Sequence, residues 1–137
     1  MKEKYKFLEH TADIKFQAFG KNLEEAFENS ALAMTKAMFE GKIKEVKKKK
    51  IEVKGKDYES LLYNFLEELL FLLDSENFFL ASCKVKINKD KFELSAELLG
   101  DSVKNYSPSL DVKAVTYNQM FVKQTSGTWV AQVVLDV

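Results

Sequence analysis

The stretch from Leu61 to Leu73 constrains the fold of this chain more than any other segment, because it is apolar along a broad helical face. Leucine or phenylalanine recurs at the spacing of an α-helix, at positions 61, 62, 65, 66, 69, 70, 72 and 73. A helix with so wide an apolar face must be covered by other elements, so we expect it to be well buried. The interruptions at Asn64, Glu67 and Glu68 make the stretch too short and too charged to span a bilayer, and no membrane partner is expected.

A second helical segment and several extended segments surround this helix. Apolar residues from Ala26 to Met38 recur at helical spacing, with Asn22 and Glu25 before them as a capping pair, and Asp57 can cap the leucine-rich helix. Alternating or extended stretches lie at 5–8, 13–19, 51–55, 79–87, 92–98, 112–125 and 128–137. This order predicts an α+β fold in which two helices pack on one face of a mainly antiparallel sheet, a two-layer sandwich. At 137 residues the chain is expected to form a single domain, 1–137.

The charged residues limit the classes of partner. The 21 basic residues balance 21 acidic ones, and every basic residue is lysine. Lysine acts as a point charge, whereas arginine reads phosphate and guanine through two hydrogen bonds at once. Direct, sequence-specific binding of nucleic acid is therefore not expected. The four lysines 47–50 form the one block of like charge and are interpreted as a solvated strand edge or loop.

The single cysteine and the charged start of the chain indicate the compartment. Cys83 can form no internal disulfide, and its place between Ala81 and Val85 on an alternating strand is that of a small core residue. The first six residues are mostly charged and do not resemble a signal segment. The protein is therefore expected to be cytoplasmic.

Two acidic residues, far apart in the sequence, stand at the ends of apolar segments. Asp13 opens one strand, and Asp136 ends the apolar run that precedes Val137. If these strands lie side by side, the two carboxylates and the α-carboxylate that follows Val137 would meet and repel one another. A hard divalent cation is the usual remedy, and oxygen-only ligands favour Ca²⁺, Mg²⁺ or Mn²⁺ over Zn²⁺. Without that pairing, each aspartate is an ordinary strand-end carboxylate.

Two further residues are candidates for accessory roles. His10 is the only histidine and could act as a base or as one ligand beside Asp13, although a lone histidine more often satisfies a hydrogen bond. Lys113 is a polar position at the head of an apolar segment. Phosphate-binding loops, dinucleotide fingerprints, metalloprotease motifs and nucleophile elbows are absent from the sequence. No complete set of catalytic residues is found.

Three blocks of sequence resemble the archease family. The first runs from Glu9-His10-Thr11-Ala12-Asp13-Ile14 through Ala18-Phe19-Gly20 to Leu23-Glu24-Glu25-Ala26-Phe27-Glu28-Asn29, the second is Val112-Lys113-Ala114-Val115-Thr116-Tyr117, and the third is Val134-Leu135-Asp136-Val137. The likeness covers essentially the whole chain in the family's order.

The resemblance implies a function as an accessory protein and not as an enzyme. Archeases assist a GTP-dependent tRNA-splicing ligase of the RtcB type, promoting guanylylation of the ligase and multiple turnover and broadening its choice of nucleotide. The resemblance also implies a divalent metal site, calcium being the metal expected first, held by Asp13 and Asp136 with an oxygen of Val137. The implied partner is the ligase itself.

The chain departs from the family pattern at three places, and two other functions remain open. Asn118 stands where a histidine is common, Phe65 where a tryptophan is common, and a histidine usual in the loop before Val112 is missing. The lost histidines weaken the case for acid–base chemistry in that loop. One alternative function is a stand-alone metal-dependent phosphoesterase or hydrolase with His10 as the base. The other is a chaperone-like interaction module that binds through an exposed apolar patch.

Overall fold

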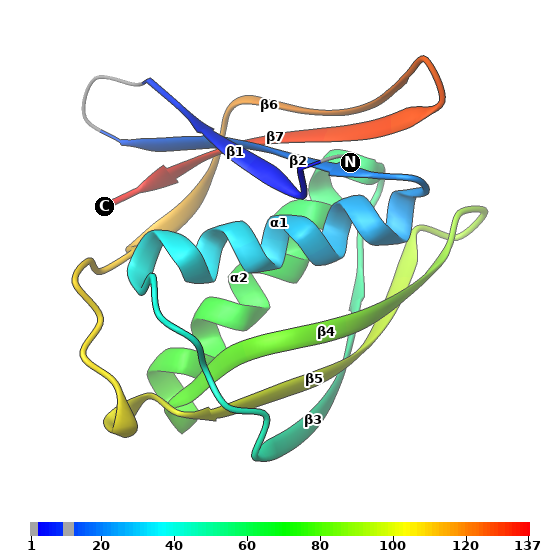
Figure 1. Cartoon of the computed structure of the whole chain (residues 1–137). Helices are drawn as coiled ribbons and strands as arrows, with labels where there is room; N and C mark the ends of the chain where they lie inside the picture. The colour runs from blue at the N-terminus through cyan, green and yellow to red at the C-terminus, as the bar shows by residue number, and fades with distance from the viewer. Residues whose placement is uncertain (1–2, 10–12) are drawn as a thin grey trace.

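The computed structural model describes residues 3–9 and 13–137, and two helices lie between two antiparallel sheets (Figure 1). The elements in chain order are β1 (Tyr5–Leu8), β2 (Ile14–Gly20), α1 (Leu23–Met38), β3 (Lys47–Lys54), α2 (Tyr58–Glu76), β4 (Phe78–Asn88), β5 (Glu93–Ser102), a short 3₁₀ turn (Val103–Asn105), β6 (Ala114–Thr125) and β7 (Thr128–Asp136). One sheet has the strand order β1-β2-β7-β6, and the other has the order β3-β5-β4.

The α+β class predicted from the sequence is confirmed, with both helices packed against antiparallel strands. The strands nevertheless form two sheets, one on each side of the helices, where the sequence analysis expected a single sheet on one face. The reason is visible in the helices, because the buried residues of α1 cover a wide arc of its surface, with Ala33 toward one side and Ala31 toward the other. One sheet can cover only one side of such a helix, and the β3-β5-β4 sheet covers another.

The expected helix caps are present. The Asn22 side chain accepts a hydrogen bond of 2.8 Å from the Glu25 main-chain N–H at the start of α1. Asp57 accepts a bond of 2.7 Å from the Ser60 N–H at the start of α2. Each cap satisfies an N–H group that has no partner inside the helix, which fixes where the helix begins. The turn at Asn88 and the turn before Thr128 also join the strand pairs that the sequence predicted.

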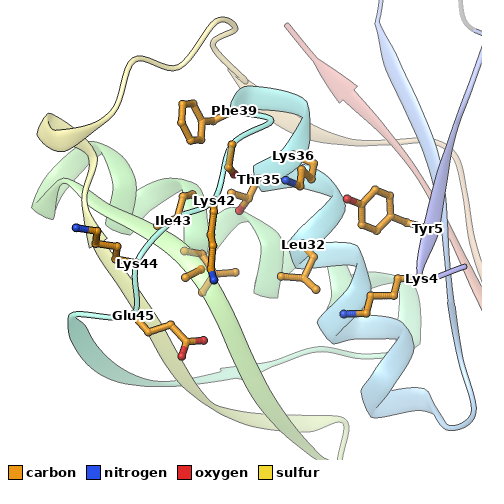
Figure 2. A pocket seen from close by; sticks show the side chains of 13 residues that line it. Lys4, Tyr5, Leu32, Thr35, Lys36, Phe39, Lys42, Ile43, Lys44 and Glu45 are labelled. Carbon is orange, nitrogen blue, oxygen red and sulfur yellow. Dashed lines mark hydrogen bonds between the residues drawn. The ribbon is translucent and has the colours of Figure 1, made fainter.

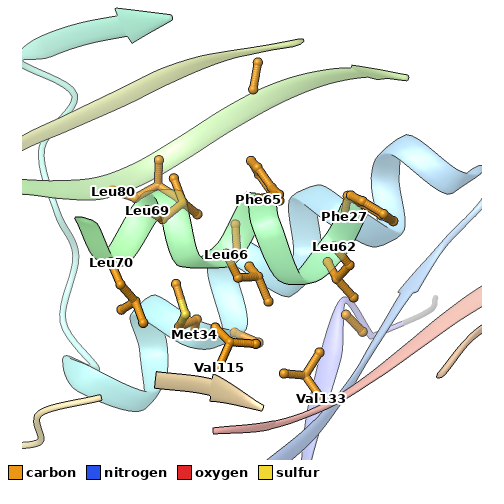
Figure 3. Packing of buried hydrophobic residues seen from close by; sticks show 14 of the residues in the cluster. Phe27, Met34, Leu62, Phe65, Leu66, Leu69, Leu70, Leu80, Val115 and Val133 are labelled. Carbon is orange, nitrogen blue, oxygen red and sulfur yellow. The ribbon is translucent and has the colours of Figure 1, made fainter. Parts of the chain in front are cut away.

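The core is one continuous cluster of apolar side chains that joins the helices to both sheets (Figure 3). Phe27 of α1 and Phe65 of α2 are fully buried, and their rings stack with centroids 6.2 Å apart. Val133 of β7 reaches the same cluster from one sheet, and Leu98 of β5 reaches it from the other. Phe65 is therefore a packing residue at the centre of the fold.

Helix carboxylates hold the outer edges of two strands. Glu28 of α1 accepts a hydrogen bond of 2.8 Å from the N–H of Val85, at the free edge of β4. Glu67 of α2 accepts one of 2.7 Å from Val115, at the free edge of β6. Burial raises the pKa of the Glu28 carboxyl. These carboxylates occupy N–H groups that another strand could otherwise pair with, so they protect the edges from unwanted association.

The lysine run 47–50 lies in β3, which is an edge strand of its sheet. This confirms the interpretation of the run as a charged strand edge, which discourages pairing with another chain.

Within the described residues, no helix is long and apolar enough to cross a membrane.

Asp101, at the end of β5, should govern part of the acid sensitivity of the fold. It accepts hydrogen bonds from the Tyr106 hydroxyl (2.8 Å) and the Ser102 N–H (2.7 Å). These bonds, that of Tyr106 first, hold the pKa of the Asp101 carboxyl below its ordinary value. A lowered folded-state pKa adds stability above the unfolded pKa of about 4, and this stability is lost as the pH falls through the lowered value.

We therefore expect Asp101→Asn to lower the unfolding temperature at neutral pH and to flatten its decline in acid. Thermal unfolding followed by circular dichroism from pH 7 down to pH 2 measures both effects. The control is Asp90→Asn in the exposed β4–β5 turn, which should keep the wild-type acid slope. An unchanged slope in Asp101→Asn would contradict the assignment.

Candidate metal centre at one end of the larger sheet

Three strand ends meet at one end of the four-stranded sheet. Ile14 of β2 pairs with Leu135 of β7, and Asp13 and Asp136 are the next residues along the chain from this pair. On the other side of β7, Ala114 of β6 pairs with Asp136. Figure 1 shows the end of β7 and the start of β6 together on the left of the molecule. The strand pairing on which the sequence hypothesis depended is therefore present.

The strand alternation places both aspartates on the solvent side of the sheet. Leu135 is fully buried and belongs to the core, so its neighbour Asp136 points the other way, and it is exposed. Phe16 is likewise buried in the core, and Asp13 is three residues before it, in the opposite phase of the strand. A partner could therefore reach the Asp136 carboxylate from the outer face, whereas Asp13 is partly buried.

The other predicted site residues have different outcomes. The Lys113 N–H donates a hydrogen bond of 2.8 Å to the Asp136 carbonyl oxygen, so Lys113 lies beside the aspartates at the start of β6, and it is exposed. Val137 is partly buried and packs against the core. His10 lies outside the described residues, so its role as a base or ligand stays a prediction.

A polar network next to the aspartates was not predicted from the sequence. The Lys15 ammonium donates a hydrogen bond of 2.8 Å to the side-chain oxygen of Gln119, a residue 104 positions away. Gln132 donates one of 2.7 Å to the Gln119 carbonyl and accepts one of 2.9 Å from Gln17. Lys15 follows Asp13 by two residues, and residues two apart in an extended segment point to the same face. The sequence alone could therefore have predicted that Lys15 and Asp13 share a face.

An irregularity in β6 positions Gln119 over this face. The pairing of β6 with β7 is regular up to Thr116 and resumes only at Phe121, so residues 117–120 form a bulge. Gln119 has φ of 56°, a left-handed conformation that non-glycine residues adopt infrequently. Asn118, which replaces the histidine common in the family, is exposed in this bulge. The bulge therefore follows the short regular segment of β6, Ala114 to Thr116, whose first residue pairs with Asp136.

The donor atoms at this end fit a hard cation in type and charge. Two carboxylates and main-chain oxygens are the ligands that Ca²⁺ and Mg²⁺ prefer, and two negative charges balance one divalent ion. Among residues 3–9 and 13–137, however, no group of three or more His, Cys, Asp or Glu side chains is placed to hold a metal. Any further ligands would have to be main-chain oxygens, water or atoms of a partner.

Cys83 has the environment of a structural residue. Burial raises the pKa of its thiol to about 12, and the neighbouring Glu28 carboxylate adds to the rise. A thiol with so high a pKa is almost entirely protonated at neutral pH and is a poor nucleophile. This agrees with the prediction that Cys83 is a small residue packed beside the core.

A separate hollow of about 680 Å³ lies between β1, α1 and the start of β4 (Figure 2). Lys4, Lys42 and Lys44 are on its rim, and Leu32 forms part of its apolar floor. Lys36, also on the rim, donates hydrogen bonds to main-chain carbonyls just beyond the end of α1. The hollow includes none of the predicted site residues that the structure describes, so it offers nothing to the candidate metal centre.

The fold and this site describe a small α+β protein with an exposed aspartate, Asp136, and a partly buried one, Asp13, at the end of one sheet. The model of the archease protein family (MTH1598/TM1083) matches residues 5–137. The archease of Methanosarcina mazei is 40% identical over 98% of this chain and 97% of its own length, and that of Pyrococcus abyssi is 39% identical over 98% and 99%. The chain belongs to the archease family.

Solved structures show the same fold. The solution structure of Methanobacterium thermoautotrophicum protein 1598 matches with a TM-score of 0.81 and 34% identity, over 98% of this chain and 99% of that one. The crystal structure of an archease from Thermotoga maritima, described as a possible chaperone, matches with a TM-score of 0.68, over 95% of this chain and 94% of that one. At 18% identity this second likeness concerns the fold alone.

Proposed function

We propose that this protein activates a GTP-dependent tRNA-splicing RNA ligase of the RtcB type in the cytoplasm. It would do so by promoting guanylylation of the ligase and multiple turnover. Membership of the archease family supports the proposal, and the observation that carries it is the pairing of Ile14 with Leu135, the residues next to Asp13 and Asp136. A role in assisting another protein also agrees with the description of the Thermotoga maritima relative as a possible chaperone.

In this proposal, the end of the four-stranded sheet faces the ligase. The Asp13 and Asp136 carboxylates, with a main-chain oxygen of Val137, would hold a divalent cation, Ca²⁺ first and Mg²⁺ or Mn²⁺ as alternatives. A bound cation would supply positive charge to offset the two carboxylates and to attract anionic groups of the partner. The hydrogen bond of Lys15 to Gln119 would hold the nearest strand lysine in place beside the aspartates.

The test is RNA joining by the cognate ligase at substoichiometric concentration, with and without this protein, in Mg²⁺, Mn²⁺ or Ca²⁺. We expect joining to rise from a single round to many rounds when the protein is added. The control omits the ligase, so that any metal-stimulated hydrolysis by the protein alone is detected. Unchanged joining in all three metals would refute the proposal, and hydrolysis in the control would favour a stand-alone hydrolase.

A further inference from the structure

The lysines of this chain gather in one part of the fold, although the formal net charge is zero. Residues 42–56 and 84–97, which contain β3, the end of β4 and the first half of β5, hold twelve of the 21 lysines but only five of the 21 acidic residues. This part carries an excess of seven positive charges, and the remaining residues carry an excess of seven negative charges. The protein is therefore strongly bipolar, and charge separation on this scale steers charged partners.

Five of these lysines project from the outer face of the three-stranded sheet, which we call the basic face. Ile51 and Val53 of β3 and Val85 and Ile87 of β4 pack against the core, so the residues between them point to solvent. The lysines of the basic face are Lys48, Lys50 and Lys54 on β3 and Lys84 and Lys86 on β4. The two lysine rows are separated by β5 alone, a distance of about 10 Å at ordinary strand spacing.

The glutamates of the basic face lower its charge without neutralising it. Lys50 and Lys84 both pair in register with Glu97 on the central strand, so a single carboxylate lies between two ammonium groups. Lys48 is 3.8 Å from the same Glu97, at an exposed position where an ion pair contributes little. A shallow hollow of about 530 Å³ is lined by three lysines and two glutamates, namely Lys50, Lys84, Lys86, Glu52 and Glu97. The small residues Ser95 and Ala96 of the central strand also line it, and the lysines outnumber the carboxylates.

The chemistry of the basic face distinguishes RNA from a protein as its partner. Protein interfaces are enriched in aromatic residues, Met and Arg and depleted in Lys. Among the described residues of this face, no aromatic side chain is found, and Val46 and Leu99 are apolar at one end only. Binding to a phosphate backbone needs only point charges at a suitable spacing, and its affinity comes from release of counterions.

We propose that the basic face binds the phosphate backbone of RNA without regard to base sequence. Arginine is absent from the chain, so the planar guanidinium contact, which reads guanine through two parallel hydrogen bonds, cannot form. The helices separate this face from the sheet that carries Asp13 and Asp136, as Figure 1 shows. The protein can therefore hold RNA on one side while its acidic end meets another molecule. This inference goes beyond the proposed function, because it gives the protein an RNA contact of its own.

The experiment measures fluorescence anisotropy of labelled tRNA and of a single-stranded poly(U) RNA with the full-length protein and no ligase. The test variant is Lys50→Glu/Lys84→Glu/Lys86→Glu, and the control is Lys21→Glu/Lys104→Glu/Lys123→Glu. Both variants change the net charge equally, and all three control lysines are exposed on other elements. Circular dichroism checks that both variants remain folded. A further variant, Lys50→Gln/Lys84→Gln/Lys86→Gln, removes the same three positive charges without adding negative ones.

We expect the wild type to bind both RNAs with similar affinity, and to lose about tenfold or more between about 50 and 200 mM salt. The test variant should lose about tenfold in affinity at low salt. The slope of its log binding constant against log salt concentration should be smaller in magnitude by about two. The control variant should stay close to the wild type. Activation of the ligase, measured separately on each variant, keeps a failure of this inference distinct from a failure of the proposed function.

Four results would overturn the inference. They are absence of RNA binding by the wild type, equal losses in the test and control variants, a strong preference for one RNA sequence, and binding of poly-glutamate at least as tight as RNA. The last result would assign the basic face to an acidic protein partner.

Discussion

Replacing Asp13 or Asp136 by asparagine is expected to abolish activation of the ligase while leaving the protein folded. Asparagine keeps the size of each side chain and removes the negative charge that a divalent cation requires. Because both residues are next to the pair of Ile14 with Leu135, either substitution should disable the same site. Removing one of two neighbouring carboxylates relieves repulsion, so the free energy of unfolding should change by no more than about 0.5 kcal/mol.

Three measurements on the same samples test this expectation. Calorimetric titration with Ca²⁺, Mg²⁺ and Mn²⁺ should show a loss of metal affinity of about tenfold or more. Ligation at substoichiometric enzyme should fall to the level without the protein, and thermal unfolding should stay near that of the wild type. Asp74→Asn, an exposed position on α2, is the matched control and should retain full activity. Full activation by either site variant would refute a shared role for the two aspartates.

A double substitution separates a shared site from two independent ones. If Asp13 and Asp136 hold the same cation, Asp13→Asn/Asp136→Asn should lose no more activation than either single variant, because the first change already removes the site. Losses that add would show that each aspartate contacts the partner separately.

The sequence allowed the elements of this site to be predicted, although their surroundings could not be. Asp13 and Asp136 stand at strand ends that local patterns reveal, so their meeting needed only the assumption that the first and last long strands pair. The bond between Lys15 and Gln119 depends on a bulge in β6 that no local pattern indicates. Bulges arise from the tertiary fit of one strand on another, which explains why this part of the site was missed.

The division of the strands into two sheets shows the same limit. Alternation predicted that β4 and β5 form a hairpin, and turn residues placed its connection correctly. Which strands lie beside that hairpin is decided by contacts between distant segments, such as Lys50 of β3 with Glu97 of β5. Helix α1 indicates the division into two sheets, because its buried residues occupy more than one side and must be covered by two surfaces.

Glu67 illustrates how a residue that interrupts a pattern can be required by the fold. In the sequence, Glu67 interrupts the apolar face of α2. Considered by itself, this charged residue would indicate a helix that is less completely buried. In the structure its carboxylate accepts the N–H of Val115 on the free edge of β6. This contact joins α2 to the strand that begins beside Asp136, so the helix supports the end of the sheet where the metal centre is proposed.

Phe65→Ala is expected to cause a large loss of stability. Phe65 is fully buried between α1 and the sheets, and its ring stacks on Phe27. Removing a buried aromatic ring costs about 3–5 kcal/mol, through lost transfer energy and the cavity that remains. Domains of this kind have unfolding free energies of about 5–15 kcal/mol, so this one change removes a large share. Urea unfolding followed by circular dichroism measures the loss.

The same helix supplies a matched control for this prediction. Phe71 is 58% exposed, so Phe71→Ala should change the free energy of unfolding by about 0.5 kcal/mol or less. Phe65→Leu keeps much of the volume and should fall between the two alanine variants. Phe65→Trp adds volume to the core cluster, so it should destabilise by about 1–3 kcal/mol unless Phe27 moves. Equal losses in Phe65→Ala and Phe71→Ala would contradict the central place of Phe65, because burial is the property in which the two positions differ most.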